Sequence, residues 1–142
     1  MSIPDGIYAL LGAASGVTDL LGSGDNLRVY PGMIPQGVTL PAARYNHISG
    51  LFERDLAGAV TAGEATYQID VVDDTYADAV AAAEAIRIAM DGYCDSPTTG
   101  ERFWNIILEN MATPFETPPE ASERWRWMVS MDFRIFVYLA TS

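Results

Sequence analysis

The C-terminal segment, residues 124–139, constrains the fold more than any other part of the chain. Every second position in it carries a large apolar side chain: Trp125, Trp127, Val129, Met131, Phe133, Ile135 and Val137. The positions between them carry Arg126, Ser130, Asp132 and Arg134, together with Met128, Phe136 and Tyr138. Such alternation predicts a β-strand with one face on the core. At about 3.3 Å per residue the strand would be roughly 45–50 Å long.

A strand of this length has two interpretations. It bends and turns a corner within one sheet, or it forms an edge that pairs with or packs on a neighbouring subunit. Its second face keeps Met128, Phe136 and Tyr138, and Phe115 stands at the centre of a proline-rich acidic segment, residues 113–123. We take Phe115, Met128, Phe136 and Tyr138 as the candidate interface residues.

The remaining segments predict an α+β domain in the order α-β-β-β-α-β-β. Apolar spacings of three and four predict a helix from Ile7 to Leu21, ended by Gly22. A second helix is expected over residues 75–91, where many alanines would let it lie close to a sheet. The other strands are expected at residues 26–30, 40–49, 65–72 and 103–111. Short links between consecutive strands indicate a mostly antiparallel sheet of about five strands, with both helices packed on one face.

Three further segments are predicted to connect these elements. Residues 50–63 contain three glycines and mixed charge without a clear period, which is typical of a long hairpin tip or a mobile loop. Residues 95–100 read as a turn around Pro97, and residues 113–123 as a loop. The whole chain, residues 1–142, is expected to be one domain.

The charge narrows the classes of partner. Nineteen acidic residues against eight basic ones, all Arg, give a net charge of −11. A chain this acidic repels phosphate, so direct nucleic-acid binding and attachment to an anionic membrane surface are disfavoured. No apolar run approaches the roughly 20 residues of a membrane span, and the N-terminus lacks the features of a secretory signal.

Acidic side chains gather near the predicted start of the second helix, at Asp70, Asp73, Asp74 and Asp78. Paired carboxylates there could bind Mg²⁺ or Ca²⁺. The preferred interpretation is that they complement the helix dipole and satisfy its free N–H groups. We therefore predict no metal site.

No residues form a recognisable catalytic set. His47 has no second His or Cys nearby in sequence and no hydrolase motif, so a hydrogen-bonded sheet histidine is expected. Cys94 is the single cysteine, which excludes an internal disulfide and favours an inert thiol. Trp125 and Trp127 could stack on bases, but they fall on the apolar face of the strand and are expected in the core. The chain is predicted to be no enzyme and to need no cofactor.

Several short segments follow one another in a characteristic order: VTDLLG at 17–22, RVYP at 28–31, PQG at 35–37, LP at 40–41, YQIDV at 67–71, YADA at 76–79 and IR at 86–87. Taken in this order, they resemble a known family, the tail-completion or tail-terminator proteins of long-tailed phages and of phage-like gene transfer agents. The resemblance covers about residues 7–137, and it depends on the order of the segments more than on any single one.

The resemblance implies a homo-hexameric ring that caps the tail tube and presents a surface to the head-side connector, or neck protein. DNA would pass through the lumen without specific binding, which suits an acidic chain and predicts more acid than Arg on the lumen wall. The protein would belong to the virion tail at the head–tail junction, and to the host cytoplasm before assembly. Two alternatives remain: a neck or head-completion connector subunit, and a small non-catalytic ligand-binding or regulatory domain with residues 50–63 as a lid.

Overall fold

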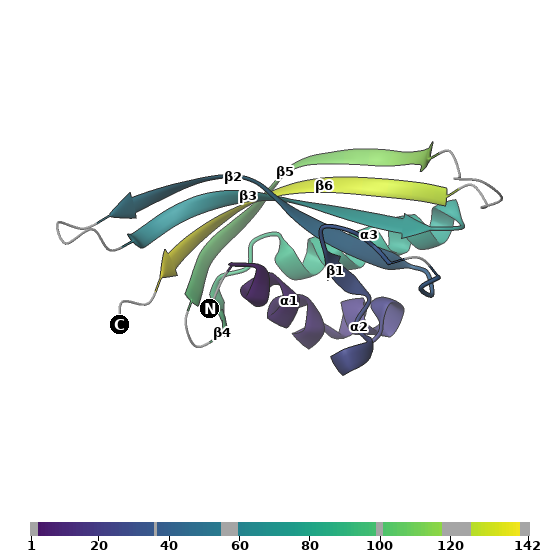
Figure 1. Ribbon diagram of the computed structural model, residues 1–142, viewed down its shortest axis with the longest axis horizontal. Helices are drawn as coiled ribbons and strands as arrows, with labels where there is room; N and C mark the ends of the chain where they lie inside the picture. The colour runs from purple at the N-terminus through teal and green to yellow at the C-terminus, as the bar shows by residue number, and fades with distance from the viewer. Residues whose placement is uncertain (1–2, 36, 55–59, 99–100, 118–125, 140–142) are drawn as a thin grey trace.

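The computed structural model confirms an α+β fold with helices on one face of a mostly antiparallel sheet (Figure 1). The structure describes residues 3–35, 37–54, 60–98, 101–117 and 126–139. The helices are α1 (Ile3–Ala13), α2 (Ser15–Leu21) and α3 (Tyr76–Met90), with a short 3₁₀ turn η1 (Gly24–Asn26). The strands are β1 (Val29–Pro31), β2 (Ala42–Arg54), β3 (Val60–Asp73), β4 (Asp95–Thr98), β5 (Glu101–Thr117) and β6 (Arg126–Leu139).

The first predicted helix is divided in two. Ala14 has an extended backbone (φ −90°, ψ 113°) and separates α1 from α2. The prediction of one continuous helix is therefore wrong. Gly12 and Gly16 flank the break, and glycine is a poor helix former. The expected end of the second piece at Gly22 is confirmed, because this glycine adopts φ 86° directly after Leu21.

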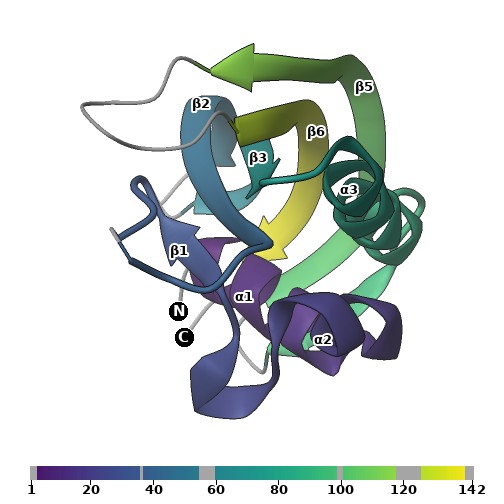
Figure 2. The same ribbon diagram turned by 90° about the vertical axis from the view of Figure 1, so that its right-hand side faces the viewer.

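The described strands form one sheet in the order β1-β2-β3-β6-β5-β4, in which only the β1–β2 pair is parallel. β6 lies between β3 and β5, pairing with β3 from Trp127 to Tyr138 and with β5 from Arg126 to Leu139. The interpretation of the last strand as an edge is therefore wrong. Its length is accommodated by curvature, which Figure 2 shows for β2, β5 and β6.

Two segments predicted as loops extend the strands instead. Residues 50–54 and 60–63 form a paired hairpin between β2 and β3, so the hairpin interpretation of residues 50–63 is confirmed; residues 55–59 lie outside the described residues. Residues 113–117 continue β5, and the rest of that predicted loop lies outside the description. The predicted turn at 95–100 contains the short strand β4. Small and polar residues in these segments obscure the apolar alternation that predicts a strand. The strands continue there because each pairs with its neighbour in the sheet.

The core lies between the helices and the inward face of the sheet (Figures 1 and 2). The alternation predicted for β6 is confirmed from Val129 to Val137, and Trp127 is partly buried against the same core. The five core residues of β6 are Val129, Met131, Phe133, Ile135 and Val137, all fully buried. α3 packs through Ala79, Ala82, Ala83, Ile86 and Met90, so its alanines do allow a close approach to the sheet.

Candidate assembly surfaces

The candidate chemical residues do not converge. The His47 ring stacks on Tyr67 with ring centroids 5.0 Å apart, and its Nε2–H donates to the Ser49 carbonyl oxygen at 2.9 Å. Cys94 is exposed. Among the described residues, no three His, Cys, Asp or Glu side chains lie close enough to hold a metal ion. These side chains therefore provide no basis for a catalytic mechanism.

The acidic cluster divides between the two faces of the sheet. The first turn of α3 is capped by Thr75, whose Oγ1 accepts from the Asp78 backbone N–H at 3.3 Å. Asp73 is only 5% exposed; its Oδ1 accepts from the Asp74 N–H at 2.6 Å, and its Oδ2 has no hydrogen-bond partner among the described residues. Burial raises the pKa of the Asp73 carboxyl above its ordinary value, and the nearby Asp78 carboxylate adds to the rise.

Asp70 instead belongs to a polar network on the outer face of the sheet, the face away from the helices. It is 1% exposed and accepts three hydrogen bonds: from Arg44 Nε at 2.8 Å, from Gln68 Nε2 at 3.1 Å and from Ser130 Oγ at 2.5 Å. The donors come from β2, β3 and β6, so one carboxylate joins three strands. Charge-assisted hydrogen bonds of this kind are stronger than neutral ones, so this carboxylate helps to hold the three strands together.

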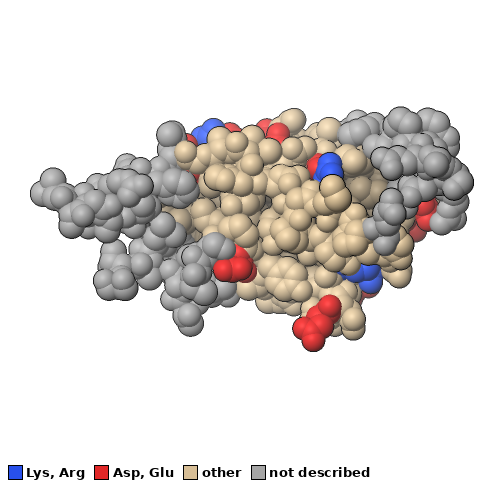
Figure 3. Space-filling model, viewed as in Figure 1, with Lys and Arg blue, Asp and Glu red and all other residues tan. Residues whose placement is uncertain are grey.

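A second ion pair lies on the same face, between Arg134 Nη2 of β6 and Glu109 Oε2 of β5 at 2.6 Å. Both pairs neutralise Arg side chains locally. Figure 3 shows charged side chains scattered singly or near an opposite charge over the described part of the face it draws, with no continuous basic patch there. The described part of the face drawn in Figure 3 is therefore unsuited to binding a phosphate backbone.

The predicted interface residues fall into two groups. Met128 is half-buried on the outer face, and its backbone pairs with that of Phe115 in β5. Phe136, also half-buried, lies eight residues further along β6, about 26 Å away, and Tyr138 follows it. The side chains of Phe115 and Tyr138 lie outside the described residues. The four residues therefore mark the two ends of a long strand pair and form no single patch.

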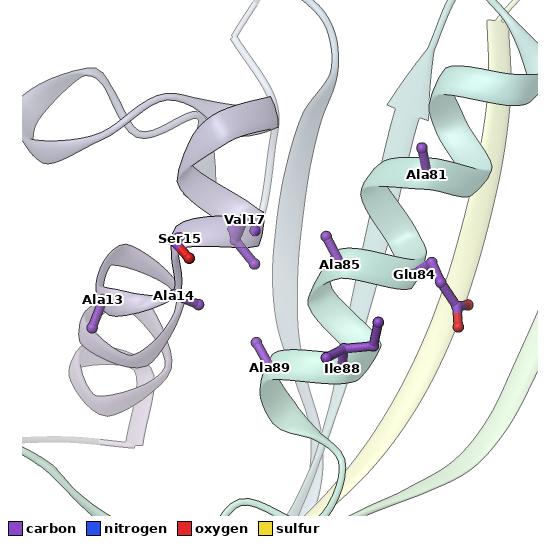
Figure 4. A pocket seen from close by; sticks show the side chains of 10 residues that line it. Ala13, Ala14, Ser15, Val17, Ala81, Glu84, Ala85, Ile88 and Ala89 are labelled. Carbon is purple, nitrogen blue, oxygen red and sulfur yellow. The ribbon is translucent and has the colours of Figure 1, made fainter.

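A shallow groove on the helical side was not predicted. It lies between the α1–α2 junction and α3, with a volume of about 700 Å³ (Figure 4). Its lining is mostly alanine and glycine, with Ile88 at 68% exposure and Glu84 at the rim. The Arg87 guanidinium hydrogen-bonds Glu84 and holds the pKa of that carboxyl below its usual range. The alanine spacing of α3 signalled close packing but gave no sign of a groove.

Comparisons with known proteins identify the family and, separately, a solved structure with the same fold. A family model described as "Tail completion protein gp17" matches residues 5–102, more than half of the chain. A solved structure described as "Virion of native gene transfer agent (GTA) particle" contains a chain with the same fold, at a TM-score of 0.63 and 20% sequence identity, covering 96% of this chain and 95% of that one. No curated protein gives a significant sequence match. No helix among the described residues is long and apolar enough to cross a membrane.

Proposed function

The chain belongs to the tail completion protein gp17 family, and on this premise we propose that it is the subunit of a ring that caps the tail tube and joins it to the head-side connector. The family match is the observation that carries the proposal. The ring is homo-hexameric, as the sequence resemblance implies, and the subunit works by assembly without catalysing a reaction.

The shape of the subunit supports a ring. Closed rings form when two different surfaces of one chain meet head to tail around an axis. The sheet has two long antiparallel strand pairs, β2–β3 and β5–β6, and the C-terminal ends of β2 and β5 lie at opposite ends of the described part of the molecule (Figure 1). Each end therefore offers a different strand pair to a neighbour.

The charge supports passage of DNA through the lumen without specific binding. The net charge of −11 and the paired Arg44 and Arg134 leave little free positive charge on the described outer face. DNA would meet repulsion or neutrality there, which suits a channel through which it slides. The assembled protein is then a virion component at the head–tail junction.

Two alternative functions can be distinguished from a tail-tube ring by the position of the chain in the particle and by the mass of its assembly. A neck or head-completion subunit would share the fold but lie one layer nearer the capsid. A small ligand-binding domain would use residues 50–63 as a lid, but most of that segment is paired in the β2–β3 hairpin, which does not favour a lid.

Native mass spectrometry of the purified chain, alone and with tail-tube protein, tests the proposal. Six copies of the 15.4 kDa chain would weigh about 92 kDa. We expect this species at high concentration or upon addition of tube protein. A chain that stays monomeric at every concentration and does not respond to tube protein would contradict the ring.

A further inference from the structure

The outer edge of β2, on the side away from β3, is covered only at its beginning. β1 pairs with Ala43–Tyr45 of β2, where the Gly32 N–H donates to the Tyr45 carbonyl at 3.0 Å. Beyond Tyr45, residues 46–54 pair with β3 on one side, and no described strand lies on the other. We call residues 46–54 the β2 open segment.

The outer edge of β5 is likewise covered only at its beginning. β4 pairs with Glu101 and Phe103, and the turn after α3 continues the cover. There the Gly92 N–H donates to the Ile106 carbonyl at 2.7 Å, and the Leu108 N–H donates to Asp91 Oδ1 at 3.1 Å. Residues 110–117 pair with β6 on one side, and no described strand lies on the other. We call residues 110–117 the β5 open segment.

The two open segments begin at one level of the sheet and run in opposite directions. Asn46, Gln68, Asp132 and Asn110 form one row across β2, β3, β6 and β5. From this row the β2 open segment continues to one end of the molecule and the β5 open segment to the other (Figure 1). The chain thus carries two different unpaired edges on opposite sides and at opposite ends of one sheet.

An unpaired edge exposes a row of N–H and C=O groups that another strand can satisfy, and a free monomer usually blunts such a row. Pro114, which has no N–H, falls in the irregularity between Ala112 and Phe115, a place that an edge strand tolerates. The other residues of each open segment keep their backbone donors and acceptors, although the Ser49 carbonyl already accepts from His47 Nε2. The partner that can satisfy such a row of backbone groups is another unpaired strand edge. A second copy of this chain provides one.

We propose that the β2 open segment of one copy pairs with the β5 open segment of the next, so that one sheet continues around the ring. The inference rests on the proposed function, because a ring requires unlike surfaces to meet head to tail. β2 and β5 run in opposite directions within the sheet, so a neighbouring copy whose strands run in the same sense brings its β2 against the β5 of the first copy in antiparallel orientation. This pairing preserves the antiparallel pattern of the neighbouring strand pairs.

The positions of the two open segments along the strands determine how the strands are oriented in the ring. To lie side by side, successive copies are displaced along the strands by about eight residues, roughly 26 Å. Strands inclined to the axis accommodate such a displacement without leaving a closed ring, as in β-barrels. The strands of each copy are therefore inclined to the ring axis.

Engineered cysteines test the pairing. In a Cys94→Ser background, single cysteines replace Ile48, Gly50 or Phe52 in β2 and Ala112, Pro114 or Glu116 in β5, and all nine combinations cover the possible registers. Disulfides form where two Cα atoms lie about 4.4–6.8 Å apart. At least one double variant is expected to give a ladder of covalent multimers on a non-reducing gel, and reductant should return the ladder to monomer.

Single-cysteine variants are the matched controls. A β2 variant mixed with a β5 variant should give a covalent dimer, while each alone should stay monomeric. Dimers from single variants alone would mean like edges meet and would overturn the proposal. So would cross-linking of Glu116→Cys to Ala81→Cys, because this would seat the neighbour's β5 end on the helical groove.

Native mass spectrometry of the same variants distinguishes a failure of the edge pairing from a failure of the ring. A ring-sized species without any cross-link between the open segments would overturn the edge pairing and leave the ring standing. Absence of both the ring and the cross-links, with tube protein present, would overturn both.

Discussion

At the scale of single residues, Asp73 lies at the junction of β3 and α3 with one carboxyl oxygen bonded and the other unpartnered among the described residues. Because burial raises its folded-state pKa, its contribution to stability is fully present below the pKa of an unfolded aspartate. That contribution is lost as pH rises through the folded-state pKa. The residue therefore costs stability at neutral pH.

Replacing this carboxylate by a neutral amide should remove the cost. Asp73→Asn is expected to raise the free energy of unfolding by about 1 kcal/mol at pH 7, and the gain should vanish below about pH 4. Urea unfolding followed by tryptophan fluorescence at several pH values measures both. Asp78→Asn, which removes an acid from the first turn of α3, should instead cost about 0.3–1 kcal/mol at pH 7. A gain for Asp73→Asn that is independent of pH would contradict the account.

Two glycines of α1 give a matched pair. A methyl group at Gly6 would collide with the ring of Phe103, which is fully buried, whereas one at Gly12 meets only Leu27 Cδ2 at 3.5 Å. Gly6→Ala should lower the free energy of unfolding by about 1–3 kcal/mol. Gly12→Ala should leave it unchanged or raise it by up to about 1 kcal/mol. Thermal unfolding of both variants checks this, and equal melting temperatures would show that α1 packs elsewhere.

At the scale of elements, helices and strands were predicted most accurately where the local spacing of apolar residues reflects which side of the element is buried. The alternation of β6, the strand at residues 65–72 and the alanine-rich helix α3 were predicted correctly, because each pattern is set by the element's own neighbours. Strand order was not predictable in this way. Alternation is the same in a central strand and an edge strand, so it could not show that β6 lies between β3 and β5.

The positions of the candidate interface residues in the sheet could be predicted only in part, for the same reason. Met128 and Phe136 lie on the outer face, as their alternation indicated. The pairing of Phe115 with Met128 depends on register shifts in β5, and the two open segments depend on how far β1 and β4 reach. These features arise from contacts between distant segments, which no local pattern records.

The β5–β6 end yields a test at this scale. Phe115→Ser should block assembly without lowering the melting temperature, if this residue contacts a partner. Phe133→Ala is the core control and should cost about 3–5 kcal/mol, because Phe133 is fully buried. Differential scanning calorimetry and native mass spectrometry report the two properties. Equal loss of stability and assembly in Phe115→Ser would make Phe115 a core residue.

At the scale of the whole molecule, the charge of the outer sheet face bears on how the proposed ring would treat DNA. The outer sheet face pairs Arg44 with Asp70 and Arg134 with Glu109, and it also carries Glu64 and Asp132. If this face lines the channel, acid exceeds Arg among its described side chains. We expect the lumen wall of the assembled ring to be neutral or acidic. A structure of the ring with a basic lumen would refute the idea that DNA slides past without binding.

The central claim concerns position in a particle, and cryo-electron microscopy of a tailed particle assembled with this chain tests it most directly. We predict a ring of six copies at the head-proximal end of the tail tube, with the fold described above recognisable in each copy. Density for the chain in a neck layer nearer the capsid, or no density for it in the particle, would contradict the account.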